Sequence, residues 1–321
     1  MPEDFSKEAR KLFDTIEKAD PIIVFRHVNP DADATGSQLG LVEWLKFEYP
    51  HKTILAAGQG ESMDDIADDQ FENALAIITD TSNADRIDDQ RFKDTPAKAR
   101  IDHHVKVEDF GEMDIVDDKA AAACEIEALL FRDAGKTIPV KAAQHLMDGL
   151  IADSQRFTIP TVRQETFDAA SWLVSQGADP NLSAKTLFNR SFADFQLSTR
   201  IRHKAALRKK FLFSLVSIQD YLSLGVPYEE AKNQVNCLSA ISGIEIWALF
   251  TEQPDHLYSA SLRSASISVR EIAAEFGGGG HECACGIKNL TSDQLAVLIE
   301  RLTEHSIPDP VRPENTDTQH A

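Results

Sequence analysis

Residues 22–37 read Ile-Ile-Val-Phe-Arg-His-Val-Asn-Pro-Asp-Ala-Asp-Ala-Thr-Gly-Ser, and this stretch decides how the rest of the chain is interpreted. The run 22–25 is apolar and β-branched, which is typical of a strand buried on both faces of a parallel sheet. His27, Asp31 and Asp33 follow in a predicted loop, before a helical pattern. Open α/β sheets bind ligands at the carboxyl ends of their strands. The stretch therefore predicts a site for a divalent metal and a phosphate, with a solvated polar turn as the alternative.

Three further apolar runs end on residues that can join the same site. The run 75–79 leads to Asp80, the run 99–101 leads to Asp102, His103 and His104, and the run 149–152 leads to Asp153. Ligands that converge in space from separate elements produce this kind of pattern. The four places together favour a shared cluster of carboxylate and imidazole groups.

The composition is compatible with an enzyme of small polyanions and opposes a binder of long nucleic acid. The chain has 321 residues, 42% of them hydrophobic, which suits two domains with large cores. Its net charge of −19 opposes binding to long duplexes, which depends on many contacts between phosphates and Lys or Arg. We find no signal-peptide pattern, no membrane-spanning apolar run and no disulfide framework. We therefore expect a cytoplasmic protein with reduced thiols and no membrane partner.

Alternating strand and helix patterns up to residue 190 predict an α/β fold with a doubly wound parallel sheet. A charged helix over 191–210 is expected to connect this catalytic domain, residues 1–190, to a smaller α/β domain over 211–306. The polar segment 307–321 is predicted to be a disordered tail. Helices are also expected over 36–47, 120–132, 139–152 and 227–241.

Four glycines, Gly277–Gly280, precede His281 in the second domain. Glycine lets backbone N–H groups approach an anion closely, so the run is a candidate phosphate site, with a flexible linker as the alternative. Cys283 and Cys285 have metal-like spacing, but no second pair completes a zinc site.

The order His-x-x-x-Asp-x-Asp, Asp, Asp-His-His, Asp resembles the DHH family of phosphoesterases. Arg263-Ser264 and Gly278–His281 resemble the domain that accompanies it. The resemblance covers residues 5–304 and is closest to the branch of bifunctional oligoribonucleases (nanoRNases) and 3′-phosphoadenosine 5′-phosphate (pAp) phosphatases. It implies an Mn²⁺-dependent phosphodiesterase and 3′(2′),5′-bisphosphate nucleotidase. Such an enzyme would hydrolyse short oligoribonucleotides, linear dinucleotides such as pApA, and pAp with a metal-bridged hydroxide.

The same resemblance implies roles for individual residues. His27, Asp31 and Asp80 would hold one divalent ion, and Asp33, Asp80, His103 and Asp153 a second, with Asp80 bridging. Imidazole ligands favour Mn²⁺ over Mg²⁺, and Co²⁺ is a further candidate. His104 would face the phosphate, and Asp102 would orient the imidazole that binds metal. The residues expected to bind substrate are Arg263, Ser264, Gly278, Gly279, Gly280 and His281. Arg156 is a candidate for a phosphate contact, with a surface salt bridge as the alternative.

Two other functions remain open. An inorganic pyrophosphatase or exopolyphosphatase could use the same metals, but it would not need a base-binding residue such as Arg263. A nucleotide-binding protein without activity is the second alternative, and the intact ligand set argues against it. The preferred substrate, the direction of RNA degradation, the metal used in cells and the presence of a homodimer are left open.

Overall fold

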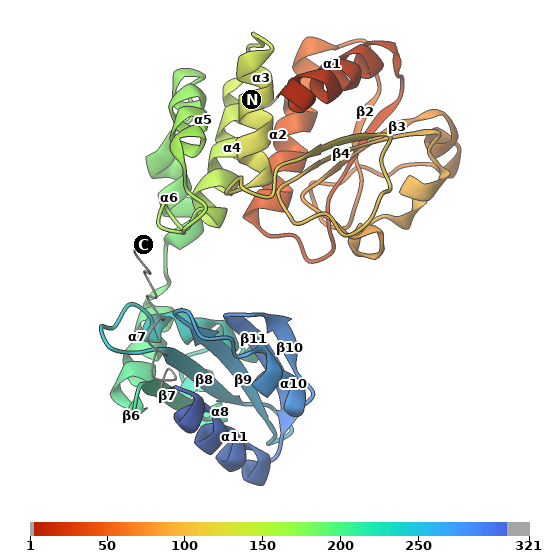
Figure 1. Ribbon diagram of the computed structural model, residues 1–321. Helices are drawn as coiled ribbons and strands as arrows, with labels where there is room; N and C mark the ends of the chain where they lie inside the picture. The colour runs from red at the N-terminus through yellow and green to blue at the C-terminus, as the bar shows by residue number, and fades with distance from the viewer. Residues whose placement is uncertain (1–2, 307–321) are drawn as a thin grey trace, which may run out of the picture. The chain divides into compact units, whose positions relative to one another are not determined.

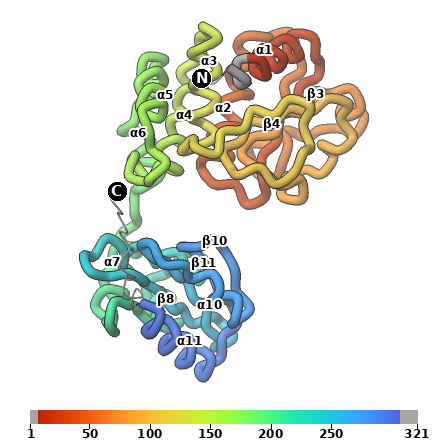
Figure 2. Tube along the Cα trace, viewed as in Figure 1, coloured from red at the N-terminus to blue at the C-terminus, as the bar shows by residue number. Residues whose placement is uncertain are grey.

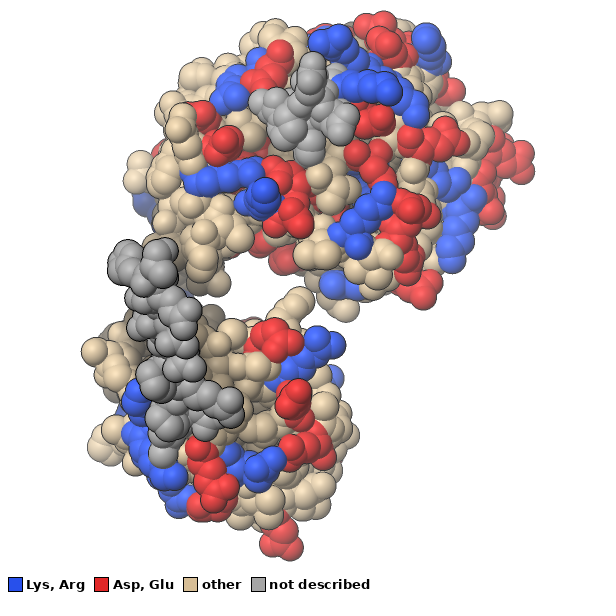
Figure 3. All heavy atoms as spheres, in the orientation of Figure 1, with Lys and Arg blue, Asp and Glu red and all other residues tan. Residues whose placement is uncertain are grey.

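The computed structural model describes residues 3–306, which divide into two compact units between Asn189 and Arg190 (Figure 1). The predicted tail at 307–321 lies outside the described residues. Within 3–306, no helix combines the length and the apolar character needed to cross a membrane. On the face shown in Figure 3, acidic and basic side chains are interspersed over both units.

The first unit contains a parallel sheet with the strand order β2-β1-β3-β4-β5. Its strands are β1 (Ile22–Phe25), β2 (Ile54–Ala56), β3 (Leu75–Thr79), β4 (Ala97–Asp102) and β5 (Met113–Val116). The chain runs from β1 to β2 on one side and then returns to β3 on the other side of β1. The carboxyl ends of β1 and β3 therefore form a topological switch point, the place where such sheets bind ligands.

The two faces of this sheet are covered differently. The helices are α1 (Glu3–Lys18), α2 (Ala32–Glu48), α3 (Ala123–Asp133), α4 (Val140–Asp153), α5 (Gln164–Ser175) and α6 (Pro180–Phe188). One face packs against α1 to α4, and α2, α3 and α4 lie side by side (Figure 2). The opposite face is covered by three short 3₁₀ helices, η1 (Asp68–Asn73), η2 (Ala84–Arg86) and η3 (Gln90–Asp94). The predicted α/β fold with a parallel sheet is confirmed, and both faces of β1 are buried as expected.

The second unit contains a mixed six-stranded sheet with the order β10-β11-β9-β8-β7-β6. Its strands are β6 (Ala206–Arg208), β7 (Phe211–Val216), β8 (Ile246–Glu252), β9 (Tyr258–Ser264), β10 (Gly279–His281) and β11 (Ala284–Leu290). Its helices are α7 (Phe192–His203), α8 (Ile218–Leu222), α9 (Tyr228–Ala231), η4 (Lys232–Leu238), α10 (Arg270–Glu275) and α11 (Ser292–His305). Only β7 and β8 are parallel neighbours.

Helices cover one face of the second sheet more completely than the other. On the first face, α10 and α11 pack over a core that includes Phe250, Leu262 and Leu298. On the second face, α7, α8, α9 and η4 pack on apolar residues of β7 and β8, such as Leu212 and Leu249. The part of this second face over β9, β10 and β11 carries small or polar residues instead. We call it the polar half-face: Ser261, Arg263, Gly279, His281, Ala284 and Gly286.

Four predicted helices differ from the observed elements. The helix predicted over 36–47 begins earlier, at Ala32, because Asp31 caps it. The helix predicted over 191–210 ends at His203. Residues 206–208 instead form an edge strand, and the chain then turns at Lys209 and returns as β7, which pairs with this strand. The helix predicted over 227–241 is a single turn of α9 followed by η4. The helix predicted over 120–132 begins at Ala123, because the preceding backbone binds site residues as described below.

Candidate active site

The first ligand candidates lie at the end of β1. His27 is buried, and its Nδ1 atom lies 2.9 Å from the carbonyl of Val28, so Nδ1 carries the hydrogen in the neutral ring. Its Nε2 atom then faces Asp31 Oδ2 at 3.7 Å and Asp80 Oδ2 at 3.4 Å. The other oxygen of Asp31 caps α2 by accepting hydrogen bonds from the amides of Asp33 and Ala34. Because of this cap, Asp33 lies in the first turn of α2 rather than in a loop.

Asp33 is completely buried and is held by the backbone that leads into α3. Its carboxylate accepts hydrogen bonds from the amides of Ala123, at 2.7 Å, and Cys124, at 3.0 Å. Gly149 of α4 packs against the same carboxylate, and a Cβ atom at Gly149 would lie 2.8 Å from Asp33 Oδ1. The absence of a side chain at Gly149 therefore lets α4 approach the carboxylate.

Asp80 lies at the centre of the cluster. It follows β3 with a φ of 56°, a left-handed backbone conformation that is costly for a residue other than glycine and is concentrated at functional sites. Its Oδ2 atom faces His27, while Oδ1 lies 3.3 Å from His103 Nε2. His103 Nε2 also lies 3.5 Å from Asp153 Oδ2 and 3.8 Å from Asp33 Oδ2. The structure thus brings together all six residues predicted as metal ligands.

His104 and Asp102 form a pair beside this cluster. His104 Nδ1 lies 2.8 Å from Asp102 Oδ1, and 40% of the His104 side chain is exposed. The prediction that Asp102 orients the metal-binding imidazole is wrong, because Nδ1 of His103 instead faces the carbonyl of Ala120 at 3.4 Å. Asp102 therefore orients His104, and its hydrogen bond leaves Nε2 of His104 free to contact a ligand.

The charges of the cluster shift the pKa values of its members. Burial alone would lower the pKa values of His27 and His103, but the carboxylates that face their rings raise both to about 10. Burial and nearby carboxylates raise the pKa of Asp33 to about 7 and that of Asp153 to about 8. Burial also opposes ionisation of Asp80, but the two histidines that face its carboxylate hold its pKa below the usual value. In the protein alone, protons thus compensate the clustered carboxylates, and a bound divalent cation would displace them.

Two buried polar atoms show whether the cluster is suited to a divalent metal ion. Asp80 Oδ1 and His103 Nε2 have no hydrogen-bond partner within the described part of the chain, although they lie 3.3 Å apart. Leaving such groups unpaired in the interior is costly. Three groups of carboxylate and imidazole atoms here are close enough to share an ion, and two of them contain Asp80. Carboxylate oxygens and imidazole nitrogens suit Mn²⁺ or a later divalent metal, so the residues fit a dinuclear centre.

A network that the sequence analysis missed supports Asp33 and His103. The segment Ala120–Cys124, which we call the cradle, supplies the Ala120 carbonyl to His103 and two amides to Asp33. Buried Glu125 anchors it by accepting hydrogen bonds from the Ala121 amide, from Thr166 Oγ1 and from the guanidinium of Arg163. Arg163 also pairs with Asp117, just before the cradle. The run of four alanines at 120–123 was the available signal, because small residues let backbone groups approach a ligand.

The second unit aligns two of its predicted residues in one row across the sheet. His281 pairs with Ala284, Ala284 with Arg263, and Arg263 with Trp247. Directly opposed residues in antiparallel strands point to the same face, so Arg263 and His281 project from the polar half-face with only Ala284 between them. Arg263 is half-buried, burial lowers its pKa, and it forms no ion pair with any residue in 3–306. It is therefore available to an anion.

Two other predicted residues do not join these groups. Ser264 belongs to the opposite face by strand alternation; it is buried, and its Oγ atom has no hydrogen-bond partner within 3–306. Arg156 is exposed, and its guanidinium lies 4.6 Å from the centre of the Phe188 ring. Neither predicted alternative for Arg156 describes this contact.

The predicted glycines have distinct surroundings. A Cβ atom at Gly278 would lie 2.5 Å from the carbonyl oxygen of Gly286, and one at Gly280, where φ is 142°, would lie 2.3 Å from that of Ala284. Close packing of the backbone requires glycine at both positions. At Gly279, by contrast, a Cβ atom would meet no atom within 4 Å.

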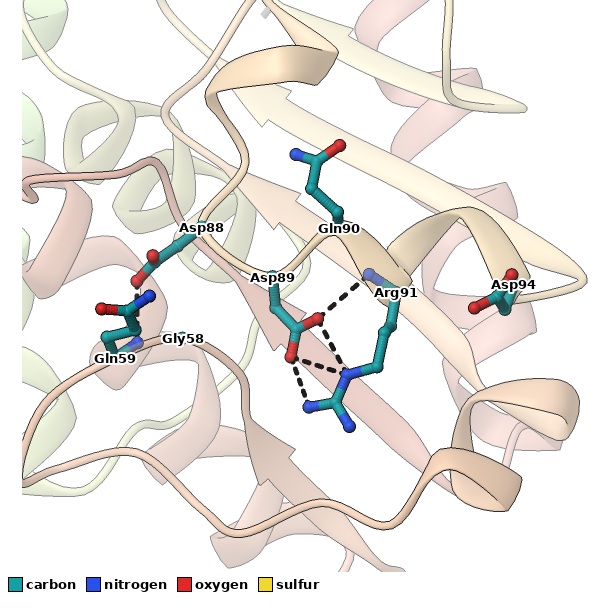
Figure 4. A pocket seen from close by; sticks show the side chains of 7 residues that line it. All are labelled: Gly58, Gln59, Asp88, Asp89, Gln90, Arg91 and Asp94. Carbon is teal, nitrogen blue, oxygen red and sulfur yellow. Dashed lines mark hydrogen bonds and ion pairs between the residues drawn. The ribbon is translucent and has the colours of Figure 1, made fainter.

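A separate hollow of about 600 Å³ in the first unit is not part of this site. It is lined by Gly58, Gln59, Asp88, Asp89, Gln90, Arg91 and Asp94 (Figure 4). Its one arginine is already neutralised, because Asp89 accepts hydrogen bonds from Nε and Nη2 of Arg91. Its remaining carboxylates would repel a phosphate.

Comparison with known proteins completes the description of the site. Residues 21–151 match the DHH family, N-terminal domain, and residues 209–305 match the DHHA1 domain. The probable bifunctional oligoribonuclease and PAP phosphatase of Streptococcus mutans is 33% identical over 279 residues, which cover 84% of this chain and 90% of that protein. The bifunctional oligoribonuclease and PAP phosphatase of Bacillus subtilis is 32% identical over 303 residues, 91% of this chain and 96% of that protein. A solved exopolyphosphatase-related protein from Bacteroides fragilis shares the fold, with a TM-score of 0.82 at 24% identity over 93% of this chain and 96% of that one.

Proposed function

Since this chain belongs to the DHH family, we propose that it is a divalent-metal-dependent phosphoesterase that hydrolyses short oligoribonucleotides, linear dinucleotides such as pApA, and pAp. One observation carries the proposal: three carboxylates and two imidazoles cluster around Asp80, whose two oxygens face different histidines. The relatives from S. mutans and B. subtilis, named for oligoribonuclease and PAP phosphatase activities, support the choice of substrates.

The geometry suggests how the ligands divide between two ions. His27, Asp31 and Asp80 would hold one ion, and Asp33, Asp80, His103 and Asp153 the other, with Mn²⁺ favoured by the two imidazoles. When bound, such a pair of ions would lower the pKa of water and stabilise charge on the attacking and leaving oxygens. The protein's own contribution is positioning: backbone amides fix Asp33, and the Val28 and Ala120 carbonyls orient the histidines.

We infer that His104 contacts the phosphoryl group. Its Nδ1 atom is held by Asp102, which fixes the ring, and its exposed edge presents Nε2. In the imidazolium form, which carries hydrogen on both ring nitrogens, Nε2 would donate a hydrogen bond to a phosphoryl oxygen and stabilise the negative charge that develops there. In the second unit, Arg263 and His281 would bind the distal phosphate and base of the substrate, and the glycine backbone would permit close approach.

A panel of substrates tests the proposal. Purified protein with Mn²⁺ is assayed for product release from pAp, pApA, a short RNA and pyrophosphate. We expect hydrolysis of the nucleotides, and a loss of about 10³-fold or more in the Asp80→Ala variant, because that change removes the shared ligand. Asp65→Ala, which removes an exposed carboxylate elsewhere in the first unit, is the matched control. No turnover of any nucleotide would contradict the proposal.

Arg263→Met separates the proposal from a pyrophosphatase with the same metals. Loss of the guanidinium should lower kcat/KM for pAp and short RNA by about tenfold or more, because a charge-assisted hydrogen bond to phosphate is lost. Mn²⁺ affinity should stay unchanged. Turnover of pyrophosphate alone, unaffected by Arg263→Met, would instead assign the protein to the pyrophosphatase class.

A further inference from the structure

The polar half-face contains a hollow of about 350 Å³ beside the row that holds Arg263 and His281. Its lining includes Tyr228, Lys232, Ser261, Gly279, Gly286 and Lys288. Gly279 pairs with Gly286, and Gly286 pairs with Ser261, so these three residues form the next row on the same face. The two rows are separated by two residues along each strand, or roughly 6.8 Å.

The floor of the hollow is bare backbone that packing does not require. A Cβ atom at Gly279 or at Gly286 would meet no other atom within 4 Å, in contrast to Gly278 and Gly280. Glycine inside a strand lowers stability, and it often marks a place where a ligand approaches the backbone closely. Two adjacent glycines that the fold does not need therefore point to a flat ligand surface.

The walls supply an aromatic ring and positive charge. Tyr228 is half-buried, and the Lys232 ammonium lies 5.5 Å from the centre of its ring and pairs with Glu229. Ser261 Oγ donates a hydrogen bond to the Lys232 carbonyl at 3.0 Å, which fixes this wall to the floor. On the β11 side, Lys288 is exposed and forms no ion pair within residues 3–306. An aromatic ring, a flat floor and ammonium groups suit a nucleobase with its phosphate.

We propose that this hollow binds an additional nucleotide of an oligoribonucleotide whose neighbouring nucleotide contacts Arg263 and His281. Tyr228 contacts the base over the glycine floor, and Lys288 contacts the phosphate. The inference rests on the proposed function and deepens it. A mononucleotide such as pAp has one base and does not fill both rows, whereas pApApA does. The hollow thus sets the preference for substrate length.

Binding to an inactive variant tests the hollow independently of turnover. In the Asp80→Ala background with Mn²⁺ present, the dissociation constants of pApApA and pAp are measured by calorimetry for three further changes. Tyr228→Ala removes the ring, Lys288→Met removes the charge, and Gly286→Leu fills the hollow from its floor. Each should weaken pApApA binding by about tenfold and change pAp binding by less than about twofold. Lys209→Met is the control, because it removes the same charge as Lys288→Met at the turn next to β6, on the opposite edge of the sheet. It should change the binding of neither ligand.

Thermal unfolding confirms that each variant is folded before it is compared. Three outcomes would overturn the inference. The changes could weaken the binding of pApApA and pAp equally, they could weaken neither, or the Asp80→Ala protein could fail to bind pApApA. Failure of the proposed function has a different signature. In that case the unmodified protein hydrolyses neither ligand, while the difference between pApApA and pAp in binding persists.

Discussion

The two units build their polar sites in opposite ways. In the first unit, the candidate ligands are mostly buried, and Asp33, His27 and His103 each have a backbone partner that fixes their orientation. In the second unit, Arg263 and His281 stand on the polar half-face, where Arg263 is only half-buried and Gly279 offers bare backbone. Positioning reacting groups demands fixed side chains, whereas recognition of a flexible chain demands an accessible surface. The difference matches a division between chemistry and binding.

Glycine illustrates the contrast most sharply. At Gly149, a Cβ atom would lie 2.4 Å from Cys124 Sγ and 2.8 Å from Asp33 Oδ1, so the residue is needed for packing at the metal cluster. At Gly286, a Cβ atom would meet nothing within 4 Å. The same residue type therefore serves close packing at Gly149 and an open surface at Gly286.

The largest difference between the two units is expected when Gly149 and Gly286 are each replaced by alanine in separate variants. Gly149→Ala should lower Mn²⁺ affinity by about 100-fold and destabilise the first unit by about 1–3 kcal/mol, because the new methyl displaces Asp33 and Cys124. Gly286→Ala should leave stability unchanged or raise it by up to about 1 kcal/mol, because alanine fits and restricts the unfolded chain. Metal titration and thermal unfolding measure both. Equal Mn²⁺ affinity and equal stability of the two variants would contradict the different roles of these glycines.

A smaller effect is expected from the network behind the cradle. Arg163→Met removes the guanidinium that joins Glu125 to Asp117, and the cradle then holds Asp33 and His103 less firmly. We expect Mn²⁺ affinity to fall by about 10–100-fold, as for other residues that orient metal ligands. Excess Mn²⁺ should restore kcat, which a general loss of folding would not allow.

Arg132→Met is the matched control for Arg163→Met. Arg132 pairs with Asp133 and Asp168 near the surface, away from the cradle, and surface pairs contribute little. Similar metal affinities in the two variants would show that the Arg163 network does not position the ligands.

The sequence predicted those parts of the fold that depend on continuous burial. The strands 22–25 and 75–79 were predicted with their observed bounds, because strands buried on both faces consist of uninterrupted apolar residues. The acidic and imidazole residues that follow these strands lie together in the structure. Local pattern failed at 206–208: the charged stretch 195–210, which lacks glycine and proline, indicated a helix, but residues 206–208 pair with β7 as a strand.

Two other differences share one physical cause: contacts made by backbone groups leave no mark in the side-chain pattern. The sequence order Asp102-His103-His104 cannot show which imidazole the carboxylate contacts, since the answer depends on the Ala120 carbonyl reaching His103. The start of α3 at Ala123 likewise depends on amides that bind Asp33 from 90 residues away. The sequence also cannot show that Arg263 and His281 lie in one row. That arrangement depends on the register in which β9 and β10 each pair with β11, which lies between them.

The smallest expected effect is the release of protons when ligands bind, which should differ between the two units. With the protein's charges alone, the pKa values of His27 and His103 are raised to about 10, so both rings are protonated at neutral pH. A metal ligand must be deprotonated, so metal binding should release at least about one proton, and apparent affinity should rise with pH until the rings lose their protons. Calorimetry of Mn²⁺ binding in buffers of different ionisation enthalpy counts these protons. The proposed nucleotide site of the second unit has no such buried pair, so we expect the Asp80→Ala variant to bind pAp with little proton exchange. Metal binding whose heat is independent of the buffer would contradict the assignment of both histidines as ligands.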